Sequence, residues 1–238
     1  IVPDAFRIAM SGRPGPIWID VPKDVQMELI EFAEWPEIGI SDKPPALDAM
    51  SIQDAATMIN EAKRPIVYVG GGAIHSNATD SVRALIERLN APTVMTLMGL
   101  GVLASRHPLS LGMLGMHAAR HANQALEECD TLIVLGARFD DRATGKVAQF
   151  CPNAKIVHID IDASELNKIK NAQVGIVADL GEALDYLIPQ IEDRFEDAWN
   201  RRIEQLKRDF PGEDRRLDDP LSPYGIIDHV ARMLEGET

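Results

Sequence analysis

Residues 136–142, with the sequence GARFDDR, carry the densest group of side chains that could do chemistry. They follow residues 131–135, a short apolar run of the kind that forms a buried strand. A glycine at a strand end lets the backbone turn sharply and approach a ligand, and the two arginines and two aspartates can bind an anion and hydroxyl groups together. In an open parallel sheet, ligands lie just beyond the carboxyl ends of the strands. The run therefore predicts a site for a nucleotide or a nucleotide-like cofactor.

Other predicted strand ends carry similar residues. Glycines occupy positions 70–72 after a predicted strand and before a helix. A backbone without side chains there could approach a pyrophosphate, but neither GxGxxG nor GxxxxGK(S/T) is present, and a tight turn explains the glycines equally well. Asp160 closes a later strand, where an acidic residue can accept hydrogen bonds from ribose hydroxyls. Asp162 fits better as the cap of the next short helix, and for Asp179 capping and ligand binding are equal alternatives.

Two further segments could face a ligand. Residues 96–99 (TLMG) end a predicted strand, and residues 114–117 (LGMH) stand at the entrance to a helix. His117 and His121 are four residues apart, which suits two metal ligands on one helical face. No glutamate of an HExxH motif lies between them and no third ligand stands out, so we predict no metal site. Nucleophile motifs such as GxSxG do not occur.

The elements that must position these residues alternate regularly. Strands are predicted at residues 65–69, 92–97, 131–135, 156–159 and 175–178, and helices at residues 51–62, 77–89, 117–128 and 163–169, with Ser51 and Asp54 spaced as a capping box. Strands separated by helices predict a parallel sheet covered on both faces. Right-handed crossovers make it doubly wound. The predicted fold class is α/β, with a doubly wound parallel sheet of about six strands.

The two ends of the chain depart from this alternation. Residues 1–28 contain the end of a helix (residues 4–10), a turn, and a strand (residues 17–21) that has no partner strand nearby, while residues 29–50 and 211–223 have the composition of linkers. Apolar residues at helical spacing from 180 to 210 predict two helices separated near Pro189. A last helix is predicted at residues 224–234. Because the chain begins with Ile1, we expect it to be a piece of a longer polypeptide.

The composition argues against several functions. A net charge of −13 over 238 residues is unlike a general nucleic-acid binder, which needs a basic face. The sequence has no run of eighteen apolar residues, so we predict no membrane span, and we identify no signal peptide at its start. Cys129 and Cys151 lack CxxC spacing, and free buried thiols in a reducing compartment fit them better than a disulfide or a redox pair. These features indicate a cytoplasmic protein.

Several motifs together resemble one enzyme family. They are SGRPGP at residues 11–16, DVPKDVQ at 20–26, LGMLGMH at 111–117, GARFDDR at 136–142 and HIDID at 158–162. In this order they are similar to the catalytic subunits of acetolactate synthase (acetohydroxyacid synthase), and the likeness runs over essentially the whole chain.

The resemblance implies a thiamine-diphosphate enzyme of three domains. Such enzymes condense two pyruvates, or pyruvate and 2-oxobutyrate, in branched-chain amino-acid synthesis. Thiamine diphosphate and Mg²⁺ carry that chemistry, and FAD is required although no net redox change occurs. By this resemblance, residues 1–28 are the tail of the pyrimidine-binding domain, 29–50 a linker, 51–210 the central FAD-binding domain, and 211–238 a linker and the start of the next domain. It also implies a homo-oligomer of catalytic subunits with a separate regulatory subunit.

The resemblance further implies roles for individual residues. The residues that would contact FAD are Arg13 from the neighbouring domain's edge, Gly70, Gly71, Thr96, Leu97, Leu114, Gly115, Met116 and His117 along the flavin, Gly136, Ala137, Arg138, Phe139 and Asp140 at the phosphates and sugar, and Asp160, Ile161 and Asp179 on the adenosine side. Lys23, Met116, Asp141 and Arg142 would lie near the substrate entrance.

The sequence also departs from the family pattern. Ala118 stands where the family usually has glycine, and its methyl group crowds a backbone approach to the flavin. The thiamine-activating glutamate and the GDG…N metal motif have no counterpart, so the resemblance implies no catalytic residue in this chain and no acetolactate from this chain alone. Two alternatives remain: the central domain of a related thiamine enzyme, such as pyruvate oxidase or glyoxylate carboligase, or a nucleotide-binding domain without catalysis of its own.

Overall fold

The computed structural model describes residues 1–31, 33–195, 198–211, 219 and 221–234, and one parallel sheet forms its centre. The sheet's strands are β1 (Pro65–Val69), β2 (Thr93–Met95), β3 (Ser110–Met113), β4 (Thr131–Leu135), β5 (Lys155–Asp160) and β6 (Val174–Val177). They lie in the order β3-β2-β1-β4-β5-β6, and every neighbouring pair is parallel. This confirms the predicted α/β fold.

The strand order reverses between β1 and β4, which are hydrogen-bonded neighbours in the middle of the sheet. Val69 pairs with Leu135, and Leu135 pairs with Ile159, so β1, β4 and β5 end at one level. In open sheets of this order, ligands bind in the crevice beyond the carboxyl ends at such a reversal. We call this carboxyl-terminal edge of the sheet the rim.

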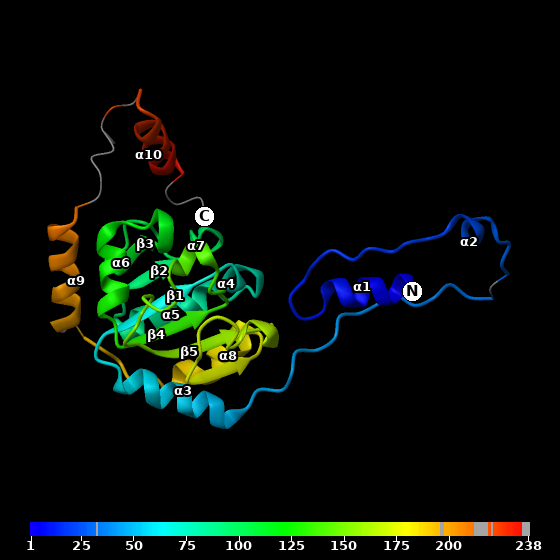
Figure 1. Cartoon of the computed structure of the whole chain (residues 1–238), viewed down its shortest axis with the longest axis horizontal. Coiled ribbons are helices and arrows are strands. Elements are labelled where there is room, and N and C mark those ends of the chain that lie inside the picture. Colours follow the sequence, from blue (N-terminus) through cyan, green and yellow to red (C-terminus); the bar gives the residue numbers. More distant parts are fainter. Residues whose placement is uncertain (32, 196–197, 212–218, 220, 235–238) are drawn as a thin grey trace.

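Helices cover both faces of the sheet because its strands are apolar on both sides. On one face, Val67 and Val69 pack with α3 (Ala49–Glu61), α5 (Thr79–Leu89) and α8 (Leu180–Leu187). On the other, Ile66 and Tyr68 pack with α6 (Arg120–Glu128) and α9 (Ala198–Asp209). Figure 1 shows α6 and α9 on one flank of the sheet and α3 and α8 on the opposite flank. Burying each large aliphatic side chain stabilises the fold by about 1.5–3 kcal/mol.

Several predicted helices begin or end elsewhere. The helix predicted at residues 51–62 is α3, which begins at Ala49. Asp48 is its N-cap and accepts hydrogen bonds from the N–H groups of Met50 and Ser51. The predicted Ser51–Asp54 capping box is therefore wrong. The helix predicted at residues 117–128 is α6, which starts at Arg120 after a 3₁₀ turn, η2 (Gly115–His117).

Four other elements show where the prediction and the structure differ or agree. The predicted helix at residues 163–169 is only the 3₁₀ turn η3 (Ala163–Glu165). The strand predicted at 92–97 stops at Met95, and η1 (Leu97–Gly99) follows. Edge strand β3 escaped prediction because its four residues include a glycine, Gly112, at φ +74°. The break near Pro189 is confirmed, since Pro189 lies in η4 (Ile188–Gln190) between α8 and α9.

The first 46 residues form an arm that extends away from the sheet (Figure 1). It contains α1 (Val2–Met10) and α2 (Lys23–Met27), neither of which has a buried residue. The strand predicted at residues 17–21 is wrong: this segment has no regular secondary structure, and Trp18 is 91% exposed. A strand needs a neighbour to receive its backbone hydrogen bonds, and none pairs with it in the described part of the chain.

At the other end, α10 (Pro223–Met233) matches the predicted last helix, with Ser222 as N-cap. Most of the predicted linker at residues 211–223 lies outside the described residues. Among the helices that the structure describes, none has the length and apolar character required to cross a membrane.

Candidate functional site

Glycine backbones in direct contact form the centre of the rim. Gly72 N donates to Gly136 O over 3.0 Å, and a Cβ on Gly70 would lie 2.2 Å from the same oxygen. Gly136 has φ +56°, a conformation that glycine adopts without strain. Gly70 and Gly72 therefore allow the turns after β1 and β4 to touch, and contact between chain segments explains them before any ligand does. Gly71, in contrast, faces Met98 and is partly exposed.

The GARFDDR run leaves β4 and leads into a short helix, α7 (Asp141–Thr144). Asp140 is the N-cap of α7, and its Oδ1 accepts from Ala143 N over 3.0 Å. The side chains of Arg138, Asp141 and Arg142 are exposed. The run thus presents two guanidinium groups and carboxylates at the rim, as predicted, with one carboxylate also engaged in capping.

Phe139 of the run points inward and is 4% exposed. Its ring packs edge-on against Tyr68, Phe150 and His158, with centroids 5.9, 6.1 and 5.3 Å apart. It therefore anchors the loop by packing. The resemblance implied a contact between Phe139 and FAD, and with the ring buried only the main chain of Phe139 is left for such a contact.

Tyr68 and His158 also hold the loop by hydrogen bonds. The hydroxyl of Tyr68 donates to Arg138 O over 2.7 Å, and Nε2 of His158 lies 2.9 Å from Ala137 O. Burial, followed by the charge of Asp140, raises the pKa of Tyr68, and burial lowers the pKa of His158. Both side chains are therefore uncharged donors near neutral pH.

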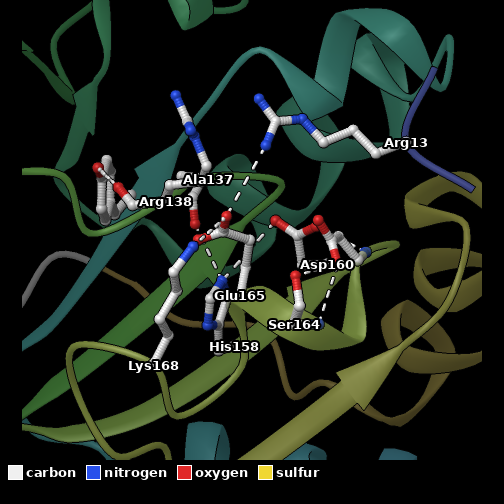
Figure 2. Close-up of polar contacts among 10 residues, drawn as sticks. Arg13, Ala137, Arg138, His158, Asp160, Ser164, Glu165 and Lys168 are labelled. Carbon is white, nitrogen blue, oxygen red and sulfur yellow. Dashed lines mark hydrogen bonds and ion pairs between the residues drawn. The ribbon is translucent and has the colours of Figure 1, made fainter. Parts of the chain in front are cut away.

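A cluster of carboxylates lies at the end of β5 (Figure 2). Asp160 is 8% exposed; its Oδ1 accepts from Asp162 N over 2.9 Å, and its Oδ2 lies 3.9 Å from His158 Nε2. Burial raises the pKa of Asp160. Glu165, also buried, pairs with Lys168 at 3.0 Å and with Arg13 at 3.8 Å. The ion pair brings the arm residue Arg13 to the rim.

Two predicted acids have defined capping roles. Asp162 accepts from Ser164 N and begins η3, as predicted. Asp179 accepts from Glu182 N over 3.1 Å and begins α8, so the capping alternative is the one that the structure describes. Ile161, between Asp160 and Asp162, is partly exposed.

Residues after β2 and β3 complete the rim. Thr96 N donates to Val69 O over 2.9 Å, and the Thr96 hydroxyl accepts from Gly99 N. Leu97 is 67% exposed and Met116 71%, and His117 is exposed as well. Gly115 is packed so closely on α7 that a Cβ would lie 2.1 Å from Arg142 O. Leu114 belongs to the buried core, so its side chain does not face a ligand.

Lys23 is not brought to this edge. It lies in α2 at the far end of the arm, away from Met116, Asp141 and Arg142 (Figure 1). His121 contacts Phe210 O through Nδ1 at 3.2 Å. In the described ranges, no three His, Cys, Asp or Glu side chains are grouped as metal ligands.

Sequence reasoning missed Tyr68, His158 and Glu165. The signal for the first two was a polar residue inside an otherwise apolar strand, at the position facing GARFDDR. Glu165 had no such signal, because one of its two ion-pair partners, Arg13, is more than 150 residues away in the sequence. Two cavities of about 260 and 320 Å³ lie at the opposite, amino-terminal edge, beside Pro92 and Lys155, and no rim residue lines them.

The rim therefore combines close-packed glycines, exposed guanidinium groups and a buried carboxylate at a strand-order reversal. Residues 52–187 match the model of the family described as "Thiamine pyrophosphate enzyme, central domain". The match covers more than half of the chain, which belongs to this family.

Within that family, the chain is similar to acetolactate synthases. It is 54% identical over 235 residues to acetolactate synthase isozyme 1 large subunit of Escherichia coli (strain K12), covering 99% of this chain and 42% of that protein. It is 41% identical to the acetolactate synthase large subunit of Corynebacterium glutamicum (96% and 38% covered) and 38% identical to acetolactate synthase 1, chloroplastic, of Zea mays (100% and 38%). The chain spans about two fifths of the length of these relatives.

Proposed function

We propose that this chain is the FAD-binding central domain of an acetolactate synthase catalytic subunit. The full enzyme would join two pyruvates, or pyruvate and 2-oxobutyrate, in the cytoplasm. The observation that carries the proposal is the 54% identity over 99% of the chain, together with a rim of the predicted composition. Thiamine diphosphate and Mg²⁺ would supply the carbon–carbon chemistry from other parts of the enzyme.

The residues at the rim fit a flavin dinucleotide. A pyrophosphate needs cations and N–H donors, and Arg138 is exposed beside backbone N–H groups of its own loop. A ribose needs a hydroxyl acceptor, and Asp160 Oδ2 has no donor within hydrogen-bond distance among the described residues. The apolar isoalloxazine ring needs exposed apolar surface, which Leu97 and Met116 offer. Arg13 would approach from the arm.

Not all of the predicted set fits equally. The main chain near Gly71 and Gly115 could face the flavin, whereas Gly70 and Gly136 pack against each other or their neighbours. We propose that Asp140 and Asp179 serve mainly as helix caps. Asp141 and Arg142, next to exposed Met116, remain proposed for the substrate entrance, and Lys23 could join them only from another arrangement of the arm.

The proposal extends to the division of the chain. Residues 1–28 would be the tail of the preceding domain, 29–50 a linker, 51–210 the central domain, and 211–238 a linker and the start of the thiamine-diphosphate-binding domain. An arm without buried residues in its helices supports the first boundary. We further propose a homo-oligomer of catalytic subunits with a regulatory subunit. This chain alone would make no acetolactate, since it supplies no thiamine-activating glutamate.

FAD titration tests the central claim. The purified chain should retain FAD after gel filtration, show a flavin absorbance spectrum and melt at a higher temperature, because a ligand that binds only the folded form raises the melting point. Arg138→Ala should weaken FAD binding about tenfold by removing a charge-assisted hydrogen bond. Arg201→Ala, an exposed arginine in α9, is the matched control.

No retention and no shift at saturating FAD would contradict the proposal. A product assay on the full-length enzyme separates the alternatives: acetolactate supports it, whereas acetyl phosphate or tartronate semialdehyde would indicate a related thiamine enzyme.

A further inference from the structure

Two buried side chains from different strands hold consecutive carbonyl groups of one rim loop. Tyr68, in β1, donates to Arg138 O over 2.7 Å, and His158, in β5, approaches Ala137 O with Nε2 at 2.9 Å. Both side chains have no exposed surface. The loop at residues 136–140 is thereby tied to two strands on either side of β4, the strand that it leaves.

The chemistry of the pair fixes which atoms donate. A carbonyl oxygen only accepts, so His158 must carry its proton on Nε2 and leave Nδ1 bare. Nδ1 is buried and has no hydrogen-bond partner in the described part of the chain. A buried ring nitrogen without a hydrogen-bond partner lowers the stability of the fold, so stability by itself does not explain a histidine at this position. The hydrogen bond that the His158 ring does make is the one from Nε2 to Ala137 O.

Peptide geometry carries this hold through to the rim. The peptide bonds here are trans, so each carbonyl points opposite to the N–H of the following residue. With the Ala137 and Arg138 carbonyls directed inward, the N–H groups of Arg138 and Phe139 point away from these two donors. Neither N–H has an acceptor among the described residues. Free main-chain N–H groups and a guanidinium group are both donors that favour an anion, and here they lie in one loop.

We propose that Tyr68 and His158 are positioning residues that orient the loop after β4 so that its N–H groups and Arg138 receive the pyrophosphate of the dinucleotide. This inference rests on the proposed FAD binding. The two side chains touch the loop and not the ligand, and they act through the orientation of two peptide groups. Phe139, packed against both rings, closes the loop over them.

The test removes each donor and keeps the packing. Tyr68→Phe deletes the hydroxyl, His158→Leu deletes the donor, and His158→Gln restores an N–H donor near the Nε2 position. Thr93→Val is the matched control, because Thr93 is fully buried and its hydroxyl donates to Ala91 O over 3.1 Å at the opposite edge of the sheet. FAD affinity is measured well below the melting temperature of each variant.

We expect Tyr68→Phe and His158→Leu each to weaken FAD binding about fivefold, the equivalent of one buried hydrogen bond. His158→Gln should bind within about twofold of the unaltered chain, and Thr93→Val should bind equally well although it melts lower. Folded Tyr68→Phe and His158→Leu variants with unchanged FAD affinity would overturn the inference.

A readout without FAD keeps this result separate from the proposed function. Trypsin cleaves after Arg138, and its rate there, relative to cleavage after Arg88 within α5, should rise in Tyr68→Phe and not in Thr93→Val. If the unaltered chain binds no FAD, the proposed function fails and so does the ligand part of this inference, while the cleavage ratio still decides whether Tyr68 orders the loop. An unchanged ratio would overturn that ordering as well.

Discussion

At the scale of single residues, the close contact of two glycine turns decides whether the rim can form. Gly136 combines a left-handed backbone with a neighbour so close that an added Cβ would lie 2.7 Å from Gly72 Cα. A larger residue at position 136 would therefore be destabilised twice, by its strained backbone conformation and by the collision of its Cβ with Gly72. Another glycine of the sheet region, Gly112, lies at φ +74°, but a Cβ added there would have nothing within 4 Å.

Gly136→Ala should therefore destabilise the fold more than Gly112→Ala. Strain at positive φ costs about 1–2 kcal/mol for an alanine, and overpacking against backbone adds about 1–3 kcal/mol at position 136 only. Urea unfolding of both variants measures the difference. Equal losses would show that the two turns can separate without cost and that the glycine contact is not what closes the rim.

The buried pair His158 and Asp160 should give stability two opposite pH dependences. Burial lowers the pKa of His158 below 6.5, so the unfolded chain takes up a proton first and stability is lost as pH falls through that value toward the folded pKa. Burial raises the pKa of Asp160 above 3.8, so the folded chain holds its proton longer and stability is lost as pH rises from that value to the folded pKa.

Unfolding free energies measured from about pH 4 to pH 8 test both signs. His158→Gln should not show the loss of unfolding free energy below pH 6.5. The unfolding free energy of Asp160→Asn should increase relative to that of the unaltered chain as pH rises. Difference curves against the unaltered chain isolate each group from the other carboxylates, including Glu165, which faces the same cluster. A difference curve of the opposite slope would contradict the burial argument for that residue.

At the scale of elements, the interpretation of Asp179 depends on whether it serves helix α8 or a ligand. Its carboxylate accepts from Glu182 N, the position expected for an N-cap. Asp179→Ala should cost about 1 kcal/mol of unfolding free energy, and Asp179→Ser should restore most of it. Asp185→Ala, an exposed aspartate of the same helix, is the control and should change little.

FAD affinity then separates the two roles. If capping is the main role, Asp179→Ser keeps both stability and affinity. A variant that keeps stability but loses FAD affinity would return Asp179 to the adenosine contacts.

The elements that sequence reasoning predicted well are those whose signal is local. The runs in β1 and β4 are continuous and apolar because both faces of a central strand are buried, and their bounds agree with prediction. The segment at residues 17–21 carries the same kind of signal, but pairing depends on a distant neighbour that the segment itself cannot specify. Glu165 and the tie between Tyr68 and Arg138 were missed for the same reason, since they join residues far apart in the chain.

At the scale of the whole molecule, the arm and the sheet contribute unequally to stability. The arm's helices bury nothing, and α1 is held largely by its own returning segment, through the ion pair of Arg7 with Asp42 at 2.7 Å. The described contact with the rim is the pair of Arg13 with Glu165 at 3.8 Å, in which the Arg13 side chain is 49% exposed. Such partly exposed pairs are worth about 0–1 kcal/mol.

A chain of residues 47–238, which keeps the Asp48 cap and Leu47, whose side chain packs against the core, should therefore unfold with a free energy within about 1 kcal/mol of the full sequence. Urea unfolding of both chains gives this comparison, and Arg13→Ala in the full chain isolates the ion pair from the rest of the arm. Glu165 would keep Lys168 as a partner at 3.0 Å, which limits the loss at the rim. A loss of several kcal/mol on truncation, not reproduced by Arg13→Ala, would mean that the arm packs on the sheet in solution and is part of the same folding unit, against the proposed boundary between residues 1–28 and the central domain.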